Sequence, residues 1–133
     1  MKKSTFILLA FIYCSACTSI SESEKSLVGD WDVQWVTTPE EGAEAIPGIN
    51  YTMNGKMLIQ NNGKLTIKAF GYDNCIFQRD STENTLDWRV SGDTLFLKNA
   101  DDEFEGMPYV IKETATDKIK LQLVEDIYLF LTR

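Results

Sequence analysis

The chain has 133 residues, of which 13 are basic and 20 acidic, and its formal net charge is −7 at pH 7. A negative charge of this size argues against binding to nucleic acid or to anionic lipid headgroups. The sequence contains no histidine, which removes the usual general base, the serine–histidine triads and most transition-metal sites. We therefore expect neither an enzyme nor a bound cofactor.

The N-terminal segment resembles a bacterial lipoprotein signal. It starts with positive charge at Lys2, and residues 6–13 are apolar but too few to span a bilayer as a stable helix. Small residues, ending with Ala16, stand directly before Cys17, as a lipoprotein peptidase requires. We interpret residues 1–16 as a cleaved signal peptide and Cys17 as the residue that receives the lipid. Cleavage as an ordinary secretory signal is the open alternative.

We expect the protein to bind a membrane through a lipid on Cys17. Each methylene buried in the bilayer contributes about 0.8 kcal/mol, so several acyl chains anchor a protein almost permanently. Lipoproteins retained in the enterobacterial inner membrane carry Asp at the position after the lipidated cysteine. This chain has Thr18 there, and the absence of Asp favours the outer membrane, at its periplasmic face or the cell surface. Residues 17–26 then form the lipidated cysteine and a flexible polar tether, followed by one domain over residues 27–133.

From Leu27 onward the sequence alternates between apolar and polar residues, as half-buried β-strands do. In the first strand, Trp31, Val33 and Trp35 share one face. Asn62 and Gly63 predict a tight hairpin turn, because both residues tolerate a positive φ. The predicted strands cover residues 27–36, 51–60, 64–70, 75–79, 86–90, 94–98, 109–113, 118–125 and 127–132. About eight or nine short strands in sequence, with residues 80–84 as a polar turn, predict an all-β closed meander or sandwich.

Carboxylates are the remaining residues with catalytic or metal-binding chemistry. The pairs Asp30/Asp32 and Asp101/Asp102 could act as acid and base, but they are spaced like solvent-facing residues. Asp101, Glu103 and Glu105 stand at the relative positions of ligands in an EF-hand calcium loop, which makes them a weak Ca²⁺ candidate. The twelfth position is Lys112, where a bidentate Glu is needed. We expect a solvated surface loop and no metal site.

A family resemblance refines the fold. Gly29-Asp30-Trp31 is a Gly-x-Trp motif at the start of the first strand, and Arg133 ends the last strand. This order is similar to that of lipocalins, and residues 88–95 and 118–121 resemble small lipocalin-like, calycin-type lipoproteins of Bacteroidetes-type bacteria. The resemblance implies an antiparallel up-and-down barrel of about eight strands, with Arg133 packed across Trp31 at the closed end.

The same resemblance implies a non-catalytic role in the envelope. Our first hypothesis is that the barrel binds a small apolar ligand. The inward residues that would line its pocket are Trp35, Met53, Met57, Trp88 and Tyr109. The alternative is a protein-interaction module, such as an inhibitor of a cationic hydrolase or an accessory subunit of a surface complex, acting through residues 38–49 or 99–108. An open apolar interior favours the first hypothesis, and a filled barrel with a protruding loop favours the second.

Overall fold

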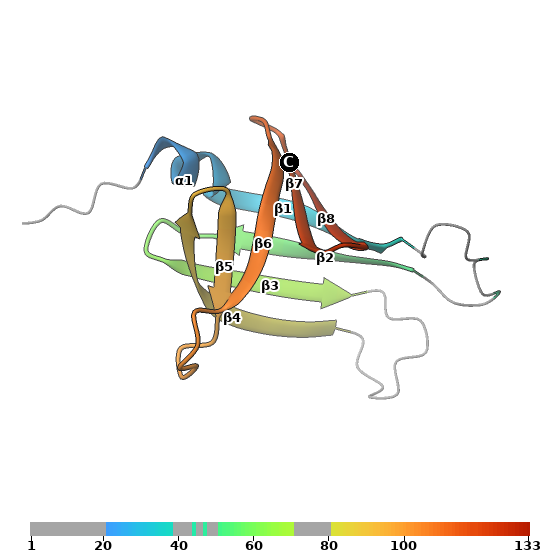
Figure 1. Ribbon diagram of the computed structural model, residues 1–133, viewed down its shortest axis with the longest axis horizontal. Coiled ribbons are helices and arrows are strands. Elements are labelled where there is room, and N and C mark those ends of the chain that lie inside the picture. Colours follow the sequence, from blue (N-terminus) through green and yellow to red (C-terminus); the bar gives the residue numbers. More distant parts are fainter. Residues whose placement is uncertain (1–20, 39–43, 45–46, 48–50, 71–80) are drawn as a thin grey trace, which may run out of the picture.

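A computed structural model describes residues 21–38, 44, 47, 51–70 and 81–133. These residues form a short helix, α1 (Glu22–Leu27), and a closed barrel of eight antiparallel strands in sequence order (Figure 1). The strands are β1 (Gly29–Thr37), β2 (Thr52–Ile59), β3 (Lys64–Phe70), β4 (Ser81–Ser91), β5 (Thr94–Lys98), β6 (Met107–Thr114), β7 (Lys118–Val124) and β8 (Ile127–Thr132). Strand β8 pairs with β1 and so closes the barrel. The predicted all-β up-and-down barrel is confirmed.

Most strands lie where the alternation predicted them. The bounds of β3, β5 and β8 match the predicted residues. Strand β4 differs, because it begins at Ser81 inside the expected turn at residues 80–84. Its polar start pairs with β3 from Phe70 onward, and this pairing overrides the weak strand propensity of the segment. The short strand predicted at residues 75–79 lies outside the described residues.

Helix α1 corrects part of the tether prediction. Residues 22–27 are helical where we expected a flexible segment up to residue 26. Ser21 caps the helix through a capping box, in which its hydroxyl accepts from the amide of Glu24 and Glu24 accepts from the amide of Ser21. Leu27 then enters the core with 1% of its surface exposed. In the described part of the chain, no helix is long and apolar enough to cross a membrane.

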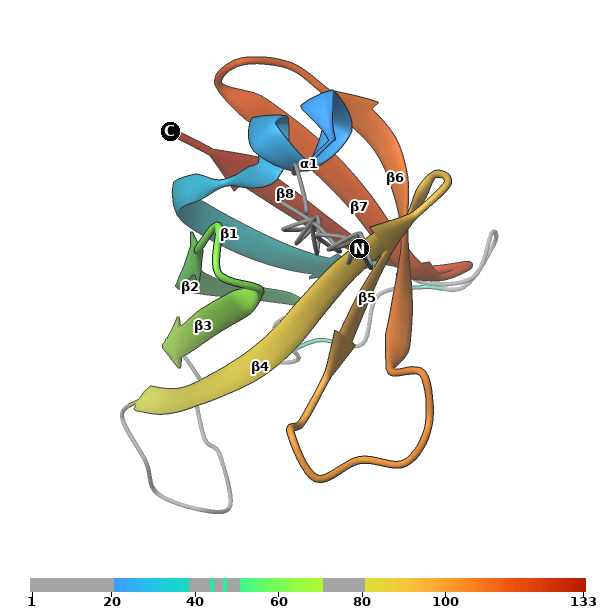
Figure 2. The same cartoon turned by 90° about the vertical axis from the view of Figure 1, so that its left-hand side faces the viewer.

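The meander defines two ends of the barrel. Helix α1, the β2–β3, β4–β5 and β6–β7 turns and the C-terminus lie at one end, which we call the helix end (Figure 2). The opposite ends of the strands, such as the end of β1 and the start of β2, define what we call the loop end. Residues facing the interior alternate with residues facing outward on each strand, as the burial pattern of β1 illustrates. The core is therefore the barrel interior.

Candidate functional site

Four neighbouring strands, β7, β8, β1 and β2, share a gradient of burial along their inner face. On β1, Trp31 and Val33 are 0% and 3% exposed, whereas Trp35, nearer the loop end, is half-buried. The other three strands show the same order, from fully buried residues at the helix end to a half-buried residue at the loop end. The half-buried residues at these strand ends are Trp35, Met53, Leu123 and Ile127.

Strands β3 and β4 extend this half-buried surface. Ile67 and Leu86 face inward and are also only partly buried against the core. We call the six residues Trp35, Met53, Ile67, Leu86, Leu123 and Ile127 the loop-end cluster; four of them stand at the loop end, and Ile67 and Leu86 stand in the middle of their strands. Asn84 pairs with Ile67 across the β3–β4 ladder, which places it on the same inner face, and its side chain is exposed. Tightly packed cores bury such apolar residues completely, so these six residues are less completely buried than the rest of the core.

The inner face carries no charge in the described strands. Asp, Glu, Lys and Arg that have a register partner in these strands occupy outward positions, and Lys112 lies in the bulge of β6. Lys56 on β2 is an example, because it binds the outward Asp32 at 2.7 Å. The buried side-chain polar atoms of the described residues all have a hydrogen-bond partner. A charged ligand group at the loop-end cluster would find no counter-charge on these strands, and its desolvation would be costly. The chemistry of the cluster therefore suits a neutral apolar ligand.

The helix end is closed by the two ends of the domain. The guanidinium carbon of Arg133 lies 4.2 Å from the ring centroid of Trp31, whose indole N–H donates to the carbonyl of Leu27 at 2.8 Å. Gly29 has a φ of 148°, and a Cβ there would stand 2.6 Å from a guanidinium nitrogen of Arg133. The glycine of the Gly-x-Trp motif is thus required by the close approach of the arginine. The structure brings all three motif residues together.

The structure separates the five predicted pocket residues into two groups. Trp35 and Met53 pair across β1 and β2 and belong to the loop-end cluster. Met57, Trp88 and Tyr109 belong to the packed core, with exposed fractions of 0%, 8% and 8%. The indole N–H of Trp88 donates to the carbonyl of Gln60 at the helix end, at 2.8 Å. Ile67, Leu86, Leu123 and Ile127 are absent from the predicted pocket, although their inward position follows from the same alternation.

The weak calcium candidate is not supported. Asp101, Glu103 and Glu105 are all exposed, and within the described residues no group of three or more acidic, cysteine or histidine side chains could hold a metal ion. Glu105 instead lies 3.4 Å from the guanidinium of Arg89 on β4. The proposed lipidation site, Cys17, lies outside the described residues.

Comparison with known proteins gives one informative likeness. The fold is similar to the crystal structure of a lipocalin-like protein from Bacteroides uniformis, with a TM-score of 0.51 and 13% sequence identity. The match covers 81% of this chain and 98% of the other. No protein-family model and no curated protein sequence matches the chain. The closed barrel and this likeness together define a lipocalin-like fold, as the sequence resemblance implied.

Proposed function

We propose that this protein is a non-catalytic, lipocalin-like binder of a small apolar ligand, held in the barrel interior at the loop end. The observation that carries the proposal is the loop-end cluster, in which six inward apolar side chains on six strands remain only half-buried. A ligand that covers this surface gains about 25 cal/mol for each Å² of apolar area removed from water. The fold likeness adds a scaffold that is generally non-catalytic.

Fluorescence can test whether the cluster is a binding site. The chain has three tryptophans, and Trp31 and Trp88 are buried, whereas Trp35 belongs to the cluster. The neutral apolar probe N-phenyl-1-naphthylamine should bind the purified protein and quench tryptophan emission. The substitution Trp35→Phe should remove most of the quenching, because the other two indoles lie farther toward the helix end.

Filling the site gives the matched control. Leu123→Trp adds bulk inside the cluster and should weaken probe binding by at least about tenfold, since the ring would occupy the ligand's space. Thr85→Trp adds the same ring on the exposed outer face of β4, where Thr85 contacts Thr66, and should leave binding unchanged. Quenching that survives Trp35→Phe, together with binding that survives Leu123→Trp, would place the probe elsewhere and contradict the proposal.

The location of the binder is a separate part of the proposal. Attachment of lipid to Cys17 would hold the barrel at the outer membrane, within reach of apolar compounds that partition into or leave the bilayer. The lipoprotein-like segment before Cys17 supports this anchor.

A second candidate function, protein interaction, is favoured by one surface feature. Phe104, Met107 and Val124 are 59%, 49% and 51% exposed and all lie at the loop end. Exposed apolar side chains among acidic residues suit contact with a cationic protein. The substitution Phe104→Ser should abolish inhibition of a cationic hydrolase such as hen egg lysozyme if the protein acts as such an inhibitor. No inhibition by the unmodified protein would remove that hydrolase as a target.

A further inference from the structure

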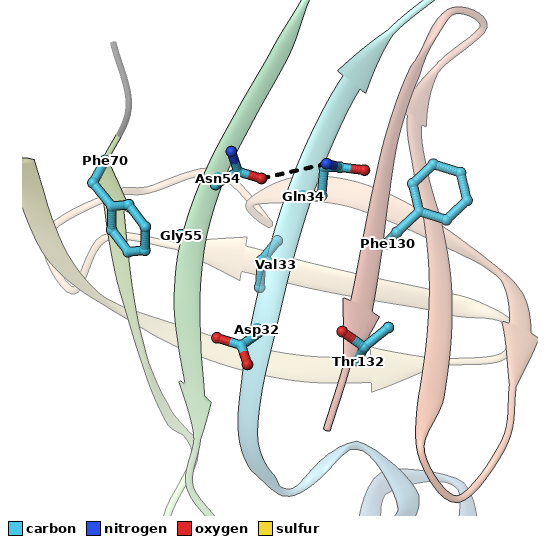
Figure 3. A pocket seen from close by; sticks show the side chains of 8 residues that line it. All are labelled: Asp32, Val33, Gln34, Asn54, Gly55, Phe70, Phe130 and Thr132. Carbon is cyan, nitrogen blue, oxygen red and sulfur yellow. Dashed lines mark hydrogen bonds between the residues drawn. The ribbon is translucent and has the colours of Figure 1, made fainter.

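The outer wall of the barrel carries a groove that is independent of the interior. It crosses β3, β2, β1 and β8 and has a volume of about 340 Å³ (Figure 3). Its lining residues are Asp32, Val33, Gln34, Asn54, Gly55, Phe70, Phe130 and Thr132. Trp35 lies on the other side of the sheet, because an inward Cβ at Gly55 would meet its ring at 2.7 Å. One sheet layer therefore separates the groove from the loop-end cluster.

The strand register builds the groove as a row of four side chains. Asn54 on β2 stands opposite Phe70 on β3 and opposite Gln34 on β1. Gln34 in turn stands opposite Phe130 on β8. Directly opposed residues in antiparallel strands have Cβ atoms about 4.5–5.5 Å apart. Two amide side chains therefore lie between two phenyl rings, as Figure 3 shows.

The polar groups of the groove offer both donors and acceptors. The Gln34 amide nitrogen donates to the Asn54 carbonyl oxygen at 3.3 Å, and this leaves the Gln34 carbonyl and the second N–H groups open to a ligand (Figure 3). Asp32, lower on the same face, binds Lys56 at 2.7 Å and keeps a second carboxylate oxygen as an acceptor. Because Lys56 compensates the charge of Asp32, the groove favours a neutral ligand over a charged one.

The two phenyl rings provide apolar faces at the margins of the groove. Phe70 is a large hydrophobic residue on the outer wall, and 37% of its surface is exposed. Phe130 is half-buried, with the Lys120 ammonium 5.5 Å from its ring centroid and the Tyr128 ring at 6.5 Å. These neighbours support one side of Phe130. A wholly apolar ligand would desolvate the amides between the rings without replacing their hydrogen bonds, and this penalty disfavours it.

We infer that this groove binds a neutral saccharide. A sugar ring has an apolar face of C–H groups and an edge of hydroxyls, and the groove has two aromatic rings and a set of amide, carboxylate and hydroxyl groups between them. Its volume lies at the lower end of the range for small-molecule sites, which fits a short saccharide of one or two rings within it. The site lies outside the barrel and does not depend on the interior function.

Saturation-transfer NMR with neutral trisaccharides tests this inference directly. The probes are cellotriose, maltotriose and triacetylchitotriose, each offered to the purified whole chain at up to about 10 mM, a concentration that detects millimolar affinity. At least one probe should receive saturation at its ring C–H protons. Phe130→Ala and Gln34→Ala should each weaken its binding by about tenfold, since each removes a stacking face or a hydrogen-bonding group.

Two control variants separate recognition from altered stability. Phe96→Ala removes an outer phenyl ring that stacks with Arg89 at 4.3 Å on β5, outside the groove. Thr66→Ala removes an outer hydroxyl on β3 that contacts Thr85 at 3.1 Å. Both variants should bind the trisaccharide as the unmodified protein does. The inference is overturned if no probe binds, if Phe130→Ala and Gln34→Ala bind normally, or if Phe96→Ala weakens binding equally.

Discussion

Arg133 connects three separate parts of the chain. Besides stacking on Trp31, its Nε donates to the carbonyl of Thr116 at 2.6 Å and a terminal nitrogen donates to the carbonyl of Val28 at 3.3 Å. Arg133→Ala should lower the free energy of unfolding by about 0.5–2 kcal/mol, the range expected for a cation–π contact. Urea denaturation measures the change.

Arg89 provides the comparison for this prediction. It also stacks on an aromatic ring, that of Phe96, but on the outer wall and without joining the chain ends. We expect Arg89→Ala to cost less than Arg133→Ala, because exposed ion pairs and stacks contribute little. An unchanged urea midpoint in Arg133→Ala would show that the contact does not stabilise the closed end.

The buried phenol of Tyr109 should make the protein less stable at alkaline pH. Burial raises the pKa of its phenol above the ordinary value of 10.0. A raised pKa in the folded state gives stability that is complete below the unfolded pKa and is lost as pH rises above about 10, where the unfolded chain ionises first. The free energy of unfolding should therefore fall more steeply above pH 10 in the unmodified protein than in Tyr109→Phe. Parallel curves for the two proteins would contradict this account.

Among the elements, α1 contributes to the stability of the fold more through its last residue, Leu27, than through its N-terminal cap, Ser21. Leu27 is 1% exposed and packs in the core, and its carbonyl accepts the indole N–H of Trp31. Leu27→Ala should cost about 2–5 kcal/mol, as large-to-small substitutions in cores do. Ser21→Ala removes the capping box and should cost at most about 2 kcal/mol. Thermal or urea unfolding distinguishes the two, and an equal cost would mean that α1 does not seal the core through Leu27.

The strands could be predicted because their alternation is strict. Three apolar residues on one face, as in β1, leave few other interpretations. The start of β4 could not be predicted, because residues from Ser81 are polar and become a strand only through pairing with β3. Helix α1 had a readable signal, since Ser21 and Glu24 form the Ser-x-x-Glu pattern of a capping box.

The candidate site was predictable only in part. The inward position of Trp35 and Met53 follows from alternation, and so does that of Met57. The difference between them arises from their height in the barrel, because Met57 is completely buried and the other two lie near the loop end. Height depends on how the eight strands are staggered when the barrel closes, which a single sequence does not specify.

At the scale of the whole molecule, the proposed lipid anchor on Cys17 would decide where the barrel works. Cys17→Ala should shift the protein from the membrane fraction to the supernatant, because it removes the thiol to which lipid would attach. Cys75→Ala changes the same residue type outside the proposed signal and should leave the protein in the membrane fraction. Immunoblots of separated membranes measure both. Continued membrane association of Cys17→Ala would contradict the lipoprotein proposal.

Ligand binding at the loop end is the central claim for the whole molecule, and methyl-resolved NMR tests it most directly. Titration of N-phenyl-1-naphthylamine into methyl-labelled protein should shift the methyl signals of Ile67, Leu86, Leu123 and Ile127. The methyl signal of Ile59 at the helix end should move little, because this residue is only 1% exposed. Shifts confined to the outer wall, or no shifts at saturating probe, would contradict an interior binding site.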